Sequence, residues 1–415
     1  MKRKSKKENS GSVSAANSVK VGGRASSCAV SGDGIQRCDE GQSKIGFFSF
    51  FTGAGFLDLG FEDVGFVPMM ANEIDKNFSR AYLYSHEQMK RPLPRFGLQT
   101  GDVCAYLETD ASRRELAARL KKAKKTCDIV GFVGGPPCPD FSVAGKQAGS
   151  KGKHGRLSQV YIDLICMNKP DFFVFENVKG LWKTAKHRAF FDDIVNQVKQ
   201  AGYAVDFRLI NALEYGAAQD RERIILVGVK RSLCTGRFDK TNGRLLDFPW
   251  KSYIRYPMDV VRSISWPTTD AFVEDGALRR PTDVPEELTV EYWFEKNDVA
   301  NHPNGNDYFT PRAGLAKMKT FAEGDDSKKC YKRVHRWRYS PTAAYGNNEV
   351  HLHPYKARRM SVAETLAIQS LPKEYVLPAD MPLSAKFKTI GNGVPYVAAK
   401  GIAQTLMRFL QEVEK

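Results

Sequence analysis

The chain has 415 residues, a formal net charge of +16 and a hydrophobic content of 42%. No apolar run approaches the roughly 18 residues that a membrane span needs, and no apolar segment follows the basic first residues as in a secretory signal. The eight cysteines form no Cys-x-x-Cys pair, so we expect no metal site, no disulfide scaffold and a reducing, intracellular setting. The positive charge favours a polyanionic partner.

The first segment, residues 1–43, is basic at its start and then rich in Ser, Gly, Ala and Asn. With so few large apolar residues it cannot offset the entropy lost on ordering, so we predict a disordered basic tail. Such a tail is either a nonspecific DNA tether or a leader with no role of its own. The second interpretation is favoured.

A strand followed by a glycine-containing turn opens the folded part of the chain. Residues 46–51 predict a strand, and residues 52–61 predict a turn, with Gly53 and Gly55, that runs into a helix. Doubly wound sheets that bind a nucleotide-like ligand begin this way, because glycines let the backbone approach the ligand and the helix N-terminus faces it.

Two acidic residues follow. Glu73 comes at the tip of a predicted strand, residues 67–71, where it can accept hydrogen bonds from ribose hydroxyls. The alternative for Glu73 is a role as a helix cap. Asp102 follows the next short connection and offers a second acid that could accept from an amine or from an adenine amino group.

Cys138 follows a buried strand predicted at residues 129–133, which two glycines and two prolines end abruptly. In open α/β sheets the chemistry lies beyond the carboxyl ends of the strands, which is where a nucleophile belongs. Most cysteines are instead small buried hydrophobic residues. The prolines on both sides of Cys138 and the Gly/Ser/Lys-rich loop after it favour the nucleophile.

Glu176 and two arginines are further candidates. Glu176 stands at the end of a strand predicted from residue 171, and we expect burial there to raise the pKa of its carboxyl, as a proton donor at neutral pH requires. Arg221 and Arg223 are two residues apart in an extended segment, so their side chains point to the same side. Both could therefore bind one anionic or carbonyl-rich group. The alternation of an α/β fold continues with helices at 157–167 and 190–200, and strands at 205–210 and 224–229.

The alternation is lost between residues 239 and 355, which predict a loop-rich domain. Within it, residues 328–339 mix six Lys or Arg residues with three aromatic residues, a composition that suits phosphate contact and base stacking. The alternative is a charged hairpin with its aromatic side chains in the core; the overall positive charge favours DNA contact. Helical periodicity returns at residues 361–369, and another helix ends near Glu412.

Eight blocks, taken in chain order, resemble the motif series of the DNA (cytosine-5) methyltransferase family, of the bacterial restriction-modification type. The blocks are residues 51–55, 72–73, 101–102, 136–138, 176–178, 219–223, 359–364 and 390–395. The resemblance covers roughly residues 45–230 and 356–410. It implies an α/β fold: a Rossmann-like domain that depends on S-adenosyl-L-methionine (AdoMet), with a smaller loop-rich target-recognition domain. The implied division is a tail at 1–43, a catalytic domain at 44–238 and 356–415, and target recognition at 239–355.

The resemblance also implies the reaction. A methyl group would pass from AdoMet to C5 of a flipped cytosine in a specific duplex DNA sequence, through a covalent adduct between Cys138 and C6. Glu176, Arg221 and Arg223 would contact the target cytosine. The residues implied at the AdoMet site are Phe51, Gly53, Gly55, Glu73, Asp102, Pro137, Leu157 and Asn392.

The implied setting is bacterial. The partners would be double-stranded DNA and a restriction endonuclease that acts on the same site without direct contact. The enzyme would be a monomer without membrane contact, cytoplasmic and associated with the nucleoid through DNA.

Two residues depart from the family pattern, which usually has Gly where Phe56 stands and Gln where Pro139 stands. We expect Phe56 to narrow the cofactor turn and Pro139 to remove a backbone donor beside the nucleophile. Neither residue touches a reacting atom, so activity is expected to survive both.

Three other functions fit parts of the sequence. A tRNA cytosine-5 methyltransferase is disfavoured by a recognition region of more than 100 residues. A silent DNA-binding regulator is disfavoured by the intact set of Cys138, Glu176 and Arg223. A Rossmann dehydrogenase would need the third glycine of Gly-x-Gly-x-x-Gly, which this chain lacks.

Overall fold

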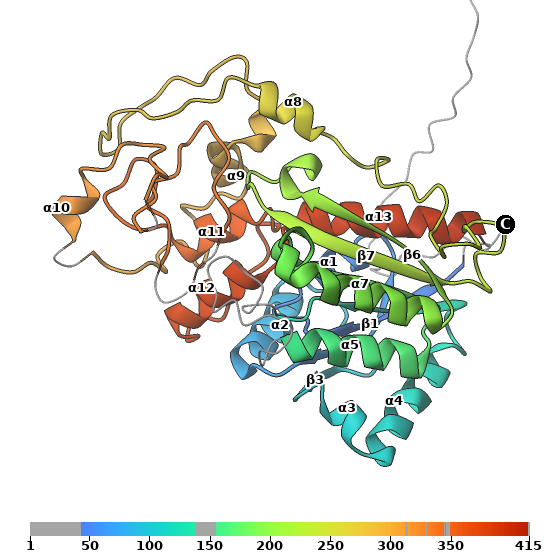
Figure 1. Cartoon of the computed structure of the whole chain (residues 1–415). Coiled ribbons are helices and arrows are strands. Elements are labelled where there is room, and N and C mark those ends of the chain that lie inside the picture. The colour runs from blue at the N-terminus through green and yellow to red at the C-terminus, as the bar shows by residue number, and fades with distance from the viewer. Residues whose placement is uncertain are drawn as a thin grey trace, which may run out of the picture. The chain divides into compact units, whose positions relative to one another are not determined.

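A seven-stranded sheet carries the fold, and helices cover both of its faces (Figure 1). The computed structural model describes residues 43–137, 155–311, 314–328, 330–343, 345 and 349–413. The predicted tail, apart from Ser43, lies outside these residues, as do Cys138, Pro139 and most of the loop after them. Among the described residues, no helix combines the length and the apolar character needed to cross a membrane.

The sheet has the order β3-β2-β1-β4-β5-β7-β6. Its strands are β1 (Ile45–Phe50), β2 (Val67–Glu73), β3 (Leu98–Thr100), β4 (Ile129–Gly134), β5 (Phe172–Val178), β6 (Tyr203–Asn211) and β7 (Glu222–Lys230). The strands from β3 to β5 pair in parallel, and β7 is antiparallel to both β5 and β6. The connection from β6 to β7 contains only the 3-10 turn η2 (Ala212–Tyr215), which is too short for a parallel crossover.

The chain order reverses between β1 and β4, so the carboxyl ends of these neighbouring strands lie side by side. Open α/β sheets bind their ligands at such a point. This edge of the sheet therefore positions the candidate site.

Each face of the sheet has its own apolar core. On β1, Ile45 and Phe47 pack with α1 (Phe56–Glu62) and α13 (Tyr396–Val413), whereas Phe48 and Phe50 pack toward the opposite face. That second face is covered by α4 (Asp110–Ala123), α5 (Gly155–Asn168) and α7 (Ala185–Gln200). The strands are apolar on both sides because helices bury both faces of the sheet.

The predicted strands and helices of the α/β alternation are confirmed. The structure adds helices that the sequence analysis did not identify: α2 (Lys76–Gln88), α3 (Ala105–Glu108), α4, α6 (Gly180–Lys183) and α12 (Leu383–Asn392). The helix predicted at 361–369 is α11 (Val362–Ile368), which Ser361 and Glu364 begin with a capping box.

Residues 239–355 are loop-rich, as predicted. Their helices are α8 (Met258–Ser263), η3 (Glu286–Leu288), α9 (Val290–Lys296) and α10 (Leu315–Met318). Ser43–Lys415 form one compact unit, within which the domain boundaries at 238/239 and 355/356 stay a prediction.

The DNA-contact interpretation of residues 328–339 is wrong for two of the basic residues. Arg333 is fully buried and donates hydrogen bonds to the carbonyls of Phe321 and Met318. Arg336 is also buried, and its guanidinium forms a two-pronged ion pair with Glu323. Because loops leave many backbone carbonyls without partners, buried arginines satisfy them here.

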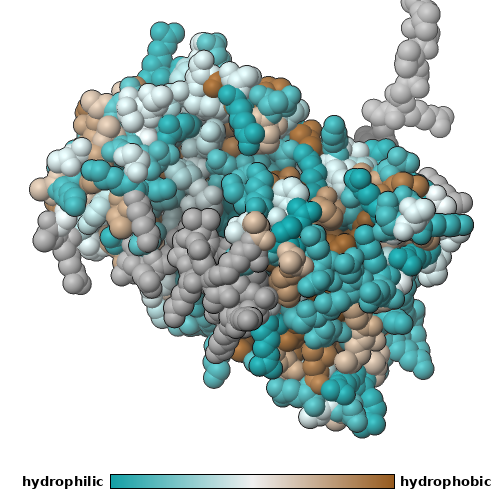
Figure 2. Space-filling view, viewed as in Figure 1, coloured by the Kyte–Doolittle hydropathy of each residue, from teal (hydrophilic) through white to brown (hydrophobic). Residues whose placement is uncertain are grey.

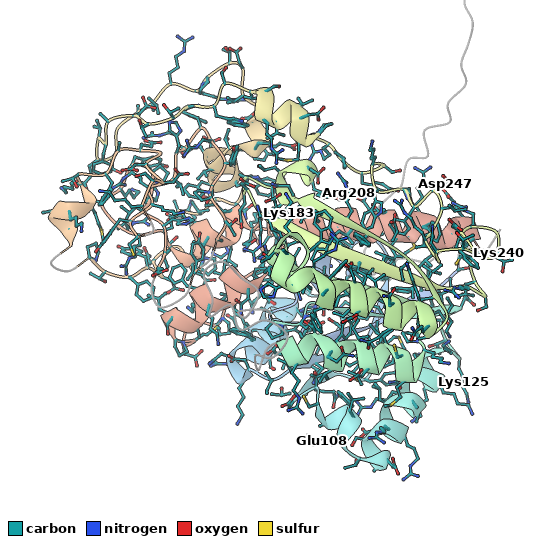
Figure 3. All side chains as sticks on the ribbon, in the orientation of Figure 1. Glu108, Lys125, Lys183, Arg208, Lys240 and Asp247 are labelled. Atoms are coloured by element: carbon teal, nitrogen blue, oxygen red, sulfur yellow. The ribbon has the colours of Figure 1, made fainter. Side chains whose placement is uncertain are left out.

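The molecular surface is largely hydrophilic on the face shown in Figure 2, with hydrophobic side chains in small separate groups. Exposed charged side chains such as Lys125, Lys183 and Lys240 project outward, while apolar side chains fill the space between the helices and the sheet (Figure 3). The positive charge is therefore divided between exposed lysines on the surface and buried arginines such as Arg333 and Arg336.

Gly228 in β7 provides a test of the core. A Cβ added there would lie 2.1 Å from the ring of Phe173, which is buried in β5. We expect Gly228→Ala to lower the free energy of unfolding by about 1–3 kcal/mol through overpacking. Urea unfolding of Gly228→Ala, Phe173→Leu and the double variant measures this. A double variant whose loss equals the sum of the two single losses would contradict the contact.

Candidate active site

The turn after β1 has an unusual backbone. Phe51, Gly53 and Gly55 have φ angles of 56°, 59° and 84°, all in the left-handed region. Glycine adopts this region freely, but Phe51 pays about 1–3 kcal/mol for it, a form of strain that collects at ligand sites. A Cβ added to Gly53 would meet no atom within 4 Å, so the backbone there faces open space.

Glu73 holds this turn from the tip of β2. Its Oε2 accepts a hydrogen bond from the Gly53 amide at 2.9 Å, and its Oε1 accepts from the Asp75 amide at 2.8 Å. Burial raises the pKa of the Glu73 carboxyl, and these amide donors oppose the shift. The cap of α2 is Asp75, which accepts from the Asn77 amide, so the helix-cap role does not belong to Glu73.

Asp102 lies beside Glu73 because β3 pairs with β2. The Gly101 amide donates to the Glu73 carbonyl at 2.9 Å, and the exposed Asp102 follows directly. One oxygen of Asp102 accepts from the Cys104 amide at 2.9 Å. Ile74, which the sequence analysis missed, is 62% exposed at the same strand tip. The sequence feature that could have identified Ile74 is its position as an apolar residue directly after the acid at the strand end.

The C-terminal segment closes on the start of α1. A Cβ on Gly393 would lie 2.0 Å from the ring of Phe56, which also packs edge-on against Tyr375 at 5.2 Å between ring centroids. The Tyr375 hydroxyl donates to the Ala54 carbonyl at 2.7 Å. The Phe56 ring thus fills space against this segment instead of the open space at Gly53. Asn392, exposed at the end of α12, directly precedes Gly393.

Leu157 lies in the first turn of α5. It is half-buried and packs on the core of the second face, one helical turn before Tyr161. The Tyr161 ring lies edge-on to Phe51, with centroids 6.1 Å apart, and its hydroxyl donates to the Val174 carbonyl at 3.0 Å. Tyr161, which sequence reasoning assigned to the core, therefore also supports Phe51.

Glu176 and Arg223 form an ion pair, with 2.9 Å between Oε1 and Nε. In the antiparallel β5–β7 pairing Glu176 faces Ile225 and Val178 faces Arg223, so the two charged side chains share one face of the sheet. Glu176 lies near the end of β5, as predicted, and the pairing with β7 extends this strand to Val178. Burial raises the pKa of Glu176, while Arg223 and Arg221 lower it.

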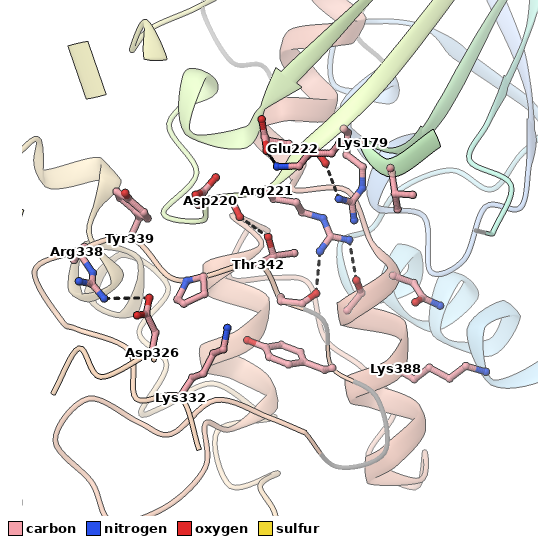
Figure 4. Close-up of a pocket in the computed structure, with 18 of the residues that line it drawn as sticks. Lys179, Asp220, Arg221, Glu222, Asp326, Lys332, Arg338, Tyr339, Thr342 and Lys388 are labelled. Carbon is pink, nitrogen blue, oxygen red and sulfur yellow. Dashed lines mark hydrogen bonds and ion pairs between the residues drawn. The ribbon is translucent and has the colours of Figure 1, made fainter. Parts of the chain in front are cut away.

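Arg221 is 2% exposed and joins three parts of the chain. Its guanidinium donates to the Ala343 carbonyl at 2.9 Å and to the Gly391 carbonyl at 2.8 Å (Figure 4). The carbonyl-rich group expected from the sequence is thus the backbone of the chain itself. This arginine ties the loop-rich region and α12 to the start of β7.

The segment before Cys138 packs against Glu176. A Cβ added to Gly135 would lie 2.7 Å from Oε2 of Glu176, and the Asn177 side chain donates to the Pro136 carbonyl at 3.4 Å. Pro137 is exposed and is the last described residue of this segment. Cys138 itself lies outside the described residues, but the chain enters it directly from this contact.

The model of the family described as C-5 cytosine-specific DNA methylase matches residues 45–408. The chain belongs to this family. It is therefore a DNA cytosine-5 methyltransferase. Type II methyltransferase M.NmeDI of Neisseria meningitidis serogroup C is 54% identical over 373 residues, 89% of this chain and 85% of that protein. Type II methyltransferase M.FnuDI of Fusobacterium nucleatum is 29% identical over 371 residues, 86% of this chain and 94% of that protein.

Solved structures share the fold. A prophage-encoded protein of E. coli, solved as a DNA modification methyltransferase, has a TM-score of 0.58 and 21% identity, covering 88% of this chain and 99% of that one. The S. pombe Dnmt2 methyltransferase has a TM-score of 0.54 and 10% identity, covering 89% and 99%. These comparisons confirm the α/β methyltransferase fold that the motifs implied.

A cleft of about 1540 Å³ lies at this edge of the methyltransferase (Figure 4). One side is formed by the start of β7, the end of β5 and α12, and the other by loops between residues 266 and 345. Its positively charged lining residues are Lys179, Arg221, Arg223, Lys332, Arg338 and Lys388. Arg338 is held by the carbonyls of Thr268 and Gly324. The cleft thus joins the Arg223 end of the ion pair to the loop-rich region.

Gly135 makes room for the Glu176 carboxylate, which gives a direct test of this geometry. We expect Gly135→Ala to lower kcat about 100-fold, because the added methyl group displaces the Glu176 carboxylate, which the motif resemblance implies contacts the target cytosine. The unfolding temperature should change little, since only the end of a side chain must move. Steady-state kinetics with duplex DNA measures this.

Gly314→Ala is the matched control, because its Cβ would meet the Tyr331 hydroxyl only at 3.4 Å and its φ of −81° suits alanine. Equal kcat values for the two variants would contradict the packing of Gly135 on Glu176.

Proposed function

We propose that this methyltransferase transfers the AdoMet methyl group to C5 of a flipped cytosine in a specific duplex sequence, through a covalent Cys138–C6 adduct. The observation that carries the proposal is the buried Glu176–Arg223 ion pair, with the backbone leading into Cys138 packed on the same carboxylate. The proposed proton donor and cation thus lie together at the sheet edge, at the point where the described chain leads toward the proposed nucleophile.

The residues at the turn fit AdoMet. The open space at Gly53 admits a ligand against the backbone, and the Glu73 oxygens keep lone pairs for ribose hydroxyls beyond the two amides they hold. The exposed carboxylate of Asp102 suits the adenine amino group, and the exposed Ile74 offers an apolar surface for the ring. Phe51, Gly55, Leu157, Pro137 and Asn392 would complete the pocket. AdoMet supplies a methyl group made electrophilic by its sulfonium.

Cys138 would make C5 reactive. Cytosine is aromatic and electron-poor, so its C5 is a weak nucleophile until a thiolate adds to C6 and turns C5 into an enamine-like carbon. The thiol must first ionise, which nearby arginine charge favours. After methyl transfer, loss of the C5 proton and elimination of the thiolate restore the aromatic ring and free the enzyme.

Glu176 and Arg223 would stabilise the charge that this addition places on the ring. Burial raises the pKa of Glu176, which favours the protonated form that can donate to N3. Arg223 can hold O2 or a neighbouring phosphate once the base replaces Glu176 as its partner. Arg221 gives its donors to backbone carbonyls, so its contribution is to position Arg223 and the cleft wall.

Duplex DNA would lie in the cleft, with residues 239–355 reading the target sequence. A stacked base hides C6, so the cytosine must swing out of the helix at a cost of a few kcal/mol. The relatives are named Type II methyltransferases, which supports a modification enzyme paired with a restriction endonuclease of the same specificity. We propose a monomer that acts on DNA in the bacterial cytoplasm and needs no contact with that endonuclease.

Cys138→Ala tests the nucleophile. We expect methyl transfer to be abolished, because no other group adds to C6, while duplex binding stays within about tenfold, or ~1.4 kcal/mol. Incorporation of tritium from labelled AdoMet and a DNA binding titration measure the two effects. Trapping on 5-fluorocytosine DNA should give an adduct that maps to Cys138; an adduct on another cysteine, or full activity of the variant, contradicts the mechanism.

Lys332→Gln tests the DNA side of the cleft. Lys332 extends into the cleft from the loop-rich region (Figure 4). If its ammonium contacts a phosphate, the variant should bind all duplexes about three- to tenfold more weakly and lower the salt slope of log affinity by about 1. Lys125 is an exposed lysine in the turn after α4, and Lys125→Gln is the matched control, which should bind DNA as the wild type does. An unchanged salt slope for Lys332→Gln would exclude the contact.

A further inference from the structure

Asp58 is a carboxylate buried directly behind the cofactor turn. It lies in α1 and is 1% exposed. Its Oδ1 accepts from the Ser49 hydroxyl of β1 at 2.7 Å, and its Oδ2 accepts from the Thr52 hydroxyl of the turn at 2.5 Å. One side chain thus joins the strand, the turn and the helix at the site.

Thr52 needs such an anchor because of its neighbours. It stands between Phe51 and Gly53, both in the left-handed region. Its amide donates to the Asn72 carbonyl at 3.1 Å, so Thr52 is held through its backbone from β2 and through its hydroxyl from α1. A strained phenylalanine persists only where its surroundings fix it, and these bonds supply that constraint.

A carboxylate is the side chain that this position requires. It offers two acceptor oxygens to two hydroxyl donors, whereas an asparagine has one acceptor oxygen and two N–H donors. Burying a charge is unfavourable unless it is hydrogen-bonded, so an apolar residue would serve better if α1 needed only packing here.

We propose that Asp58 is a positioning residue for AdoMet: it holds Thr52, and through it Phe51 and Gly53, in the conformation that receives the cofactor. This role rests on the proposed AdoMet site at the turn. Asp58 lies behind the turn and touches no reacting group, so it acts on cofactor affinity and leaves the DNA cleft and the Glu176–Arg223 pair unchanged.

The protonation state of Asp58 gives a second readout. Burial raises its pKa to about 7, opposed by the hydrogen bonds from Thr52 and Ser49. The titratable groups that face it are Glu62 on the same helix and, on α2, His86 and Tyr82; His86 contacts the Glu62 carboxylate at 3.1 Å. The pKa is raised in the folded state, so Asp58 takes up a proton as the pH falls through about 7. A protonated carboxyl must donate one bond and can no longer accept symmetrically from both hydroxyls.

Asp58→Asn is the test. At pH 8 we expect the variant to bind AdoMet about 10- to 100-fold more weakly, the effect of losing a hydrogen bond to a charged group. The KM for duplex DNA, and kcat at saturating AdoMet, should stay within about twofold of the wild type. From pH 8 to pH 6 the wild-type affinity for AdoMet should fall toward that of the variant, whose own affinity stays constant. Calorimetric titration with AdoMet and steady-state kinetics measure these quantities.

Two further variants complete the experiment. Asp63→Asn, at the C-terminal cap of the same helix, pairs with Arg91 away from the turn and should bind AdoMet as the wild type does. Thr52→Val removes one donor to Asp58 without changing the carboxylate, and it should weaken AdoMet binding even if Asp58→Asn fails to fold.

Equal AdoMet affinity in the wild type, Asp58→Asn and Thr52→Val would overturn this role alone. Equal losses in AdoMet affinity, DNA affinity and kcat would also overturn it, because they indicate a general structural defect. A wild-type enzyme that binds no AdoMet would overturn the proposed cofactor site and this role with it.

Discussion

The antiparallel pairing of β7 with β5 is the constraint on which the Glu176–Arg223 side of the site, the proposed base-binding side, depends. It brings the start of β7 to the edge where β5 ends, so Arg223 lies across from Val178 and reaches Glu176. A parallel β7 would carry both arginines to the opposite edge of the sheet. The same placement lets Arg221 hold the carbonyls of Ala343 and Gly391, so the loop-rich region and the C-terminal segment are fixed relative to the ion pair.

The turn after β1, the proposed AdoMet side of the site, is held by two buried carboxylates. Glu73, at the end of β2, accepts a hydrogen bond from the Gly53 amide, and Asp58, in α1, accepts one from the Thr52 hydroxyl. Each is buried, and burial raises the pKa of each. A buried carboxylate is unfavourable for folding unless hydrogen-bond donors surround it. We infer that Glu73 and Asp58 are present because they hold the strained turn in its conformation.

The sequence predicted most of the sheet and the order of the motif residues, because glycine turns, apolar runs and strand-end acids are local signals. It placed Glu176 at the end of β5 but could not predict its pairing with Arg223, because β7 lies more than forty residues away in the chain. It assigned DNA contact to a stretch in which Arg333 and Arg336 are buried, because charge alone does not tell a phosphate from a carbonyl. The contact between Phe56 and Gly393 joins opposite ends of the chain and leaves no local pattern.

The positive charge that is accessible to DNA is therefore smaller than the net charge of +16 suggests. Inside the protein, Arg221 and Arg333 donate hydrogen bonds to backbone carbonyls, and Arg336 pairs with Glu323. At the cleft, Lys179 pairs with Glu222 and Lys388 lies 3.5 Å from Asp75. Such exposed pairs contribute only about 0–1 kcal/mol, so a phosphate can replace the carboxylate at little cost. If DNA binds in the cleft as proposed, its phosphates would replace Glu222 and Asp75 as the partners of these two lysines.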